Sequence, residues 1–261
     1  MSAELDLVIR GGTDVDGTGR DAFEADVGVS GNRIVEIGAI AGKGAEEIDA
    51  RGKLVTPGFV DIHTHYDGQA VWDSHLAPSS WHGVTTVVMG NCGFGVAPTR
   101  RTHRDLIVRT LEKVEGMSIA ALEAGMGEDW GFETFPEYLD AIALRGTAIN
   151  VGVMIGHTPL RLYVMGEAAT ERAATTEEVV RMCALVGEAL DAGAIGFATS
   201  NRRPMLDMAA VRCRAAPPIS PRSARSPARW ARPGAACCRR PRVKGCCSTS
   251  SRRSRARPAP M

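Results

Sequence analysis

The feature that most constrains the fold is the alternation of short apolar runs with amphipathic segments that begins near Lys53. Four runs rich in Val, Ile and Ala lie at residues 54–62, 83–90, 148–156 and 192–200. Such uninterrupted runs of β-branched residues suit strands of a parallel sheet that is covered on both faces. The sequence therefore predicts an α/β protein built from βα units.

The segments between these runs carry the signals of helices. Residues 104–114 have apolar side chains at three- and four-residue spacing, and residues 135–146 end on a glycine suited to a helix C-terminus. The clearest helix is predicted over 175–193, where Thr175 and Glu178 form a capping-box pair and Gly193 ends the segment.

Four βα units amount to half of a closed barrel. A complete (β/α)₈ barrel needs eight strands and about 250 residues of its own. We therefore expect residues 56–203 to form the first half of such a barrel. Residues 1–55 contain short Val- and Ile-rich runs with Gly, Asp and Asn between them, and Ser30-Gly31-Asn32 is placed as a tight hairpin turn would be. This segment is predicted to be a small β-sandwich.

The composition changes abruptly near Arg202. From Arg202 to Met261 there are sixteen Lys and Arg and one acid, Asp207, which gives a net charge of +15. Residues 1–201 carry 15 basic and 29 acidic residues, a net charge of −14. Nine of the fourteen prolines and five of the seven cysteines also lie beyond Arg202. Residues 204–261 show no helix or strand period and are predicted to be a disordered basic tail.

This basic tail allows three interpretations. Lys and Arg neutralise phosphates, so a nucleic-acid arm is one reading, although nucleic acid is not the expected partner. A zinc module at Cys237-Cys238 and Cys246-Cys247 is another, but these adjacent cysteines lack the usual CxxC spacing. The favoured hypothesis is a frameshift shortly after Arg203, because Arg, Pro, Ala, Ser and Cys are typical of GC-rich codons read out of frame. Resequencing codons 200–210 tests it, and an intact reading frame there would exclude it.

The strongest chemical signal is the run GFVDIHTHYD at residues 58–67. Side chains at i and i+2 of a strand point the same way, so His63 and His65 are predicted to project together from the carboxyl end of the first barrel strand. Two neutral imidazoles on one side form half of a site for a divalent metal such as zinc. Asp61 has the same phase and is a candidate acceptor for one of these imidazoles.

Further candidate residues follow the later strands. Cys92 lies in GNCGFG after the second strand, where glycines allow close backbone approach and the thiolate would be a strong zinc ligand. His157 and Ser200 come after or at the end of the third and fourth runs and are candidate substrate-binding residues, with a loop histidine held by an ordinary hydrogen bond as the alternative for His157. Asp67 and Asp73 are candidates for shaping the mouth of the site.

Other classes of protein find no support in the sequence. No P-loop, GxGxxG or GxSxG motif is present, so the sequence does not indicate a nucleotide-binding protein or a serine hydrolase. No signal peptide and no apolar run of about 18 residues is visible, which leads us to expect a cytoplasmic protein without membrane contact. The oligomeric state is not indicated.

Several motifs in order resemble the D-aminoacylase branch of the amidohydrolase superfamily, the N-acyl-D-amino-acid deacylases. They are GFVDIHTHYDGQ, SSWHGVTTVVMGNCGFGVAP, GFETFPEYLD and GAIGFATS, and the resemblance covers residues 5 to about 203. It implies a zinc enzyme with one or two ions that hydrolyses the amide of an N-acyl-D-amino acid. It also implies that His63, His65 and Cys92 are metal ligands, with Cys92 in place of the modified lysine or glutamate of relatives.

The resemblance also identifies what is missing. The family draws two more histidines and a catalytic aspartate from later strands, and here no histidine follows His157. No catalytic residue is therefore identified, and the 261-residue chain is predicted to be truncated and inactive. The alternatives are a hydrolase of cyclic amides such as hydantoins or dihydropyrimidines, which Cys92 in place of a lysine disfavours, and a non-catalytic fragment that binds nucleic acid through its tail.

Overall fold

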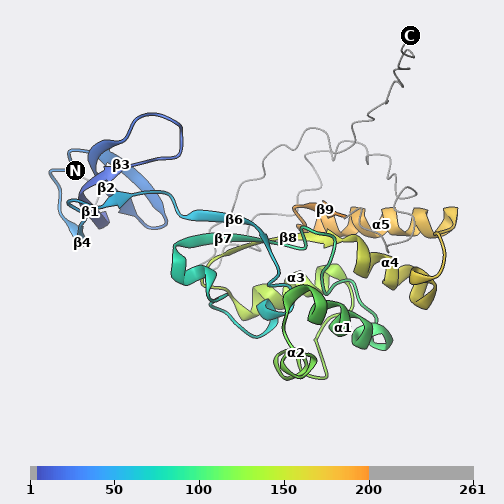
Figure 1. The fold of residues 1–261 in the computed structure, drawn as a ribbon. Helices are drawn as coiled ribbons and strands as arrows, with labels where there is room; N and C mark the ends of the chain where they lie inside the picture. Colours follow the sequence, from blue (N-terminus) through green and yellow to red (C-terminus); the bar gives the residue numbers. More distant parts are fainter. Residues whose placement is uncertain (1–4, 200–261) are drawn as a thin grey trace, which may run out of the picture.

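The computed structural model of the chain describes residues 5–199, which form two separate β-sheets and five α-helices (Figure 1). In Figure 1 the first sheet lies to one side, and the chain leads from it into the second sheet through strand β6. Ser200 and the basic tail 204–261 lie outside the described residues, so the predictions made for them stay predictions.

The first sheet is built by the N-terminal segment in the order β3-β2-β1-β4, with β5 also paired to β1. The strands are β1 Leu5–Asp14, β2 Phe23–Ser30, β3 Arg33–Gly38, β4 Gly44–Asp49 and β5 Leu54–Val55. The predicted hairpin joins β2 to β3, and Gly31 in its turn has a φ of +60°. Within residues 5–199 this segment forms one sheet, so the two-sheet sandwich remains a prediction.

The second sheet has four parallel strands in the order β6-β7-β8-β9. They are β6 Phe59–Thr64, β7 Val84–Met89, β8 Asn150–Gly156 and β9 Gly196–Ala198. Strands β7, β8 and β9 each lie within one of the apolar runs, and β6 begins in the first run and ends two residues beyond it, so the predicted parallel α/β sheet is confirmed as far as the described residues extend. Their number equals half the strands of a closed barrel.

The first apolar run, 54–62, was wrongly predicted as one strand. Leu54–Val55 pairs with β1 in the first sheet, and Phe59–Thr64 begins the second. The break falls at Pro57-Gly58, because Pro57 has no N–H to donate to a sheet. A Cβ at Gly58 would lie 2.1 Å from the Thr85 side chain, so only glycine lets the entry to β6 pass this close to β7.

The five α-helices include the three predicted ones. They are α1 Arg104–Glu115, α2 Ile119–Met126, α3 Phe135–Arg145, α4 His157–Met165 and α5 Thr176–Ala192. Four short 3₁₀ helices lie at Gln69–Val71, Ser79–His82, Arg101–His103 and Gly166–Thr170. Within the described residues, no helix has both the length and the apolar character needed to cross a membrane.

The main core lies between the second sheet and its helices. Helices α1, α2 and α3 lie together on one side of the β6–β9 sheet (Figure 1). Val87, Met89 and Ile155 of the central strands are fully buried in this core. Strand β6 differs, because Phe59 and Ile62 are 62% and 67% exposed. This edge strand of the described sheet therefore presents apolar side chains to solvent.

Helix α5 provides a test of the capping signal. Thr175 Oγ1 accepts from the Glu178 N–H at 3.3 Å, and the Glu178 carboxylate accepts from the Thr175 N–H at 2.8 Å. We expect Thr175→Ala to lower the free energy of unfolding by about 1 kcal/mol, since it removes the acceptor at the helix start. Urea denaturation followed by circular dichroism measures it. Thr176→Ala, at the exposed neighbouring position, should change stability by less than about 0.5 kcal/mol; equal losses would contradict the assignment.

Candidate metal centre

His63 and His65 lie at the carboxyl end of β6, as the strand alternation predicts. Their ring centroids are 5.3 Å apart, with the ring planes inclined at 47°. Thr64 between them points the other way, is buried, and donates through Oγ1 to the Val88 carbonyl at 2.9 Å. This bond fixes the phase of the strand end and so directs both imidazoles to the same side.

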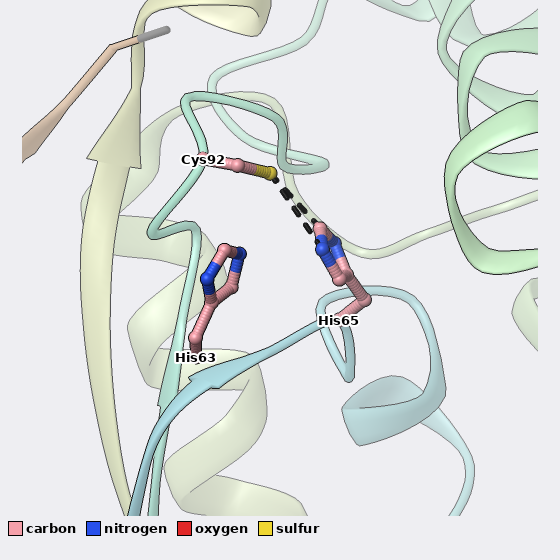
Figure 2. A group of neighbouring side chains, drawn as sticks. All are labelled: His63, His65 and Cys92. Atoms are coloured by element: carbon pink, nitrogen blue, oxygen red, sulfur yellow. Dashed lines mark hydrogen bonds between the residues drawn. The ribbon is translucent and has the colours of Figure 1, made fainter.

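Cys92 reaches the same place from the end of the neighbouring strand β7. Its Sγ lies 3.7 and 3.9 Å from the two ring nitrogens of His65, and Figure 2 shows the thiol and both imidazoles converging. One ligand atom from each of His63, His65 and Cys92 can be chosen so that all lie within 4.8 Å of one another. The structure thus brings together the three residues that the sequence predicts as metal ligands.

The loop that carries Cys92 depends on Gly90 for its path. Gly90 has a φ of +74°, and a Cβ there would lie 2.2 Å from the Met154 carbonyl oxygen, so a larger residue would displace β8. The Gly93 N–H donates back to the Gly90 carbonyl at 3.1 Å and closes the turn around Cys92. The Asn91 amide donates to the Ile62 carbonyl at 2.5 Å and ties this loop to β6.

The electrostatics of the cluster favour neutral side chains in the absence of a cation. Burial lowers the pKa of His65, and the neighbouring His63 adds to this effect. Burial raises the pKa of the Cys92 thiol, and the nearby backbone N–H of Phe94 lowers this pKa by a smaller amount. Two neutral imidazoles offer lone pairs to a metal, and a bound cation would favour the thiolate form of Cys92.

The donor set fits zinc in chemistry and nearly in size. Zinc binds histidine nitrogen at about 2.0 Å and cysteine sulfur at about 2.3 Å in tetrahedral geometry, so donors on one ion lie about 3.3–3.5 Å apart. The spread of 4.8 Å is larger, so the side chains would move closer together on binding an ion. Three protein donors leave a fourth position open, as in catalytic zinc sites.

Two nearby acids behave differently from the sequence-based expectation. Asp61 Oδ1 accepts a hydrogen bond from the His63 backbone N–H at 3.2 Å, so its recorded contact is with the main chain and not with an imidazole. Asp67 is only 3% exposed, and burial raises its pKa to about 7. The sequence pointed to Asp67 only as a residue shaping the mouth. In the sequence, only its position two residues after His65 indicated that Asp67 could lie near the cluster.

His157 is not one of the three clustered side chains. It is the first residue of helix α4, which corrects its placement in a loop, and Pro159 is tolerated because it lies in the first turn. The side chain is 3% exposed, and neither ring nitrogen has a hydrogen-bond partner among the described residues. Its ring meets Phe197 edge-on at 6.0 Å. Its predicted role in substrate binding stays a prediction, as does that of Ser200.

A parallel sheet with polar side chains gathered at the carboxyl ends of its strands is the arrangement of barrel enzymes. The sequence model of the amidohydrolase family matches residues 46–246, a range that extends past the change in composition near Arg202. The chain therefore belongs to the amidohydrolase family.

Curated relatives place the chain near enzymes that remove acyl groups. It is 41% identical over 203 residues to the N-acyl-D-aspartate deacylase of Alcaligenes xylosoxydans xylosoxydans and 38% identical over 199 residues to the D-aminoacylase of the same organism. These matches cover 77% and 76% of this chain but 38% of each relative. The chain thus spans less than half the length of the relatives it matches.

Solved structures agree in fold. A crystal structure of D-aminoacylase matches with a TM-score of 0.62 and 36% identity over 75% of this chain and 38% of that one. The N-acyl-D-glutamate deacylase of Bordetella bronchiseptica, solved with zinc and a phosphonate inhibitor, matches with a TM-score of 0.63 and 37% identity over 77% and 40%. A further D-aminoacylase structure describes a binuclear metal centre.

The buried state of His157 predicts a dependence of stability on pH. Burial, with a smaller effect of Arg161, lowers the pKa of His157 from 6.5 to about 4. Between these values the unfolded chain binds a proton at His157 that the folded chain does not, so the contribution of His157 to stability falls as pH decreases from about 6.5 to 4. At ~1.4 kcal/mol per pH unit the loss is about 3 kcal/mol.

Urea denaturation at pH 7 and pH 4 measures this loss. His157→Gln, which cannot ionise here, should lose about 3 kcal/mol less than wild type over that interval. The matched control is His75→Gln at an exposed histidine, which should keep the wild-type dependence. An unchanged pH dependence in His157→Gln would show that His157 is accessible to protons in the folded chain.

Proposed function

We propose that this chain carries part of the zinc centre of an N-acyl-D-amino-acid deacylase, with His63, His65 and Cys92 as metal ligands. The observation that carries the proposal is the convergence of these three side chains at the carboxyl ends of two adjacent parallel strands. Family membership and the deacylase relatives support the substrate class, which is an N-acyl-D-amino acid.

Each side chain has a distinct task in this proposal. A zinc ion bound here would polarise the amide carbonyl and lower the pKa of a water molecule. The half-buried His65 and the exposed His63 supply neutral nitrogen donors, and Cys92 supplies a negative charge once its proton is lost. His157 is buried and neutral at pH 7, so its ring can exchange a hydrogen bond with a substrate amide or carboxylate, and Ser200 would add a second polar contact.

The cyclic-amide alternative has weaker support. Hydrolases of that kind are expected to use a modified lysine where this chain has Cys92. The relatives reported above, which align with about three quarters of this chain, are deacylases of N-acyl-D-amino acids or D-aminoacylases. We therefore favour a linear N-acyl-D-amino acid as the substrate.

Zinc binding tests the ligand assignment. We expect Cys92→Ser and His63→Ala to lower zinc affinity by more than about 100-fold, since loss of an outer partner alone costs 10–100-fold. Competition with a chromophoric chelator at pH 7.5 measures the affinity.

The matched controls are His75→Ala and Cys246→Ser, at an exposed histidine and at a cysteine of the C-terminal segment. Both should retain wild-type affinity. Zinc that is lost in Cys246→Ser but kept in Cys92→Ser would assign the metal to the C-terminal cysteines and contradict the proposal.

Turnover by this 261-residue chain is expected to be absent. The metal-ligand cluster within residues 5–199 consists of two histidines and a cysteine, so the cluster itself supplies no carboxylate as a general base for the water. Release of free D-amino acid from N-acetyl-D-aspartate and N-acetyl-D-methionine, measured with a coupled D-amino-acid oxidase or by chromatography, provides the assay. Zinc-dependent turnover that disappears in His63→Ala would show that the chain is active by itself.

A further inference from the structure

Asp67 is a buried acid that the proposed chemistry does not use. It follows His65 by two residues, and its side chain is enclosed at the point where the chain leaves β6. Its backbone carbonyl accepts from Tyr138 Oη at 2.7 Å, and Tyr138 on helix α3 is 1% exposed. This bond fixes the main chain at Asp67 against the helical layer.

The carboxylate of Asp67 contacts both ends of the loop that carries Cys92. At the start of the loop, the Gly90 N–H lies close enough to this carboxylate to lower its pKa. At its end, Gly95 lies so close that a Cβ there would be 3.2 Å from Asp67 Oδ1. Cys92 lies between these two glycines in the sequence.

One side chain therefore joins the two segments that hold the ligands. The carboxyl end of β6 contributes His63 and His65, and the segment after β7 contributes Cys92, as Figure 2 shows. Asn91 forms a second link through the Ile62 carbonyl, but it leaves the Gly95 end of the loop untouched. Removal of the Asp67 carboxylate would take away the polar group beside the Gly90 N–H and open a void beside Gly95.

We propose that Asp67 is a positioning residue for the metal centre, which holds the Cys92 loop so that the thiol stays within coordinating reach of His63 and His65. The inference rests on the proposed function, because the contact between Asp67 and the Cys92 loop matters here only if Cys92 binds a metal. It concerns the geometry of the loop, and Asp67 itself is not a ligand.

Asp73 provides a matched control in the same stretch of chain. Its carboxylate also holds a loop, accepting from the backbone N–H groups of His75 and Ala77 at 2.8 and 2.9 Å and from the Gln69 amide. These partners all belong to residues 69–77 and not to the loop that carries Cys92. A general loss of loop stability should therefore affect Asp73 and Asp67 variants alike, whereas a positioning role should single out Asp67.

Cobalt(II) binding to the full chain is the first readout. We expect Asp67→Ala to bind cobalt at least about 10-fold more weakly and to lose intensity in the thiolate-to-cobalt charge-transfer band. Asp67→Asn keeps one acceptor oxygen and should fall between Ala and wild type, while Asp73→Asn should match wild type. Wild-type affinity and full band intensity in Asp67→Ala would overturn the proposal, and so would an equal loss in Asp73→Asn.

Alkylation of Cys92 in the metal-free chain separates this proposal from the proposed function. Site-resolved mass spectrometry follows the modification of Cys92 by iodoacetamide. A released loop should react about 10-fold faster in Asp67→Ala because local opening exposes the half-buried thiol, and Asp73→Asn should react at the wild-type rate.

The two readouts fail in different ways. If wild type binds no cobalt through Cys92 but Asp67→Ala still accelerates alkylation, the metal function fails and the positioning of the loop stands. Unchanged alkylation in Asp67→Ala overturns the positioning role whatever the metal result. Circular dichroism confirms that each variant is folded before either measurement.

Discussion

The parallel pairing of β6 with β7 is the interaction on which the candidate site depends. Thr64 is in register with Met89, so the residues that follow each strand emerge at the same level of the sheet. Cys92 is 27 or more residues from His63 and His65 in sequence, and the register of the two strands brings all three to the same edge of the sheet. Glycines at Gly58 and Gly90 permit the close approach that this pairing requires.

The cluster is held mainly through contacts with backbone groups. Thr64 donates to the Val88 carbonyl, Asn91 donates to the Ile62 carbonyl, and the Asp67 carboxylate lies beside the Gly90 N–H. Such contacts fix strand ends and loops while leaving the imidazoles and the thiol free to bind a ligand. This division suits a metal centre, because ligand side chains must be oriented and still offer their lone pairs.

The sequence predicted most of this arrangement because its signals are local. The capping box at Thr175, the hairpin at Gly31 and the i, i+2 spacing of His63 and His65 each follow from the conformation of a few neighbouring residues. The role of Asp67 was missed because it depends on a contact with Gly90, which is distant in sequence. Helix α4 was missed because the sequence from His157 to Pro159 suggested a loop. The exposure of the β6 side chains depends on what packs against this strand in space, which local sequence does not encode.

The zinc K-edge X-ray absorption spectrum of the zinc-loaded chain tests the central claim most directly. The account predicts a first shell with one sulfur at about 2.3 Å and nitrogen or oxygen neighbours at about 2.0 Å, with the sulfur contribution lost in Cys92→Ser. A shell of three or four sulfurs would place the metal on other cysteines of the chain, and a shell without sulfur in wild type would exclude Cys92. Either result would contradict a centre built from His63, His65 and Cys92.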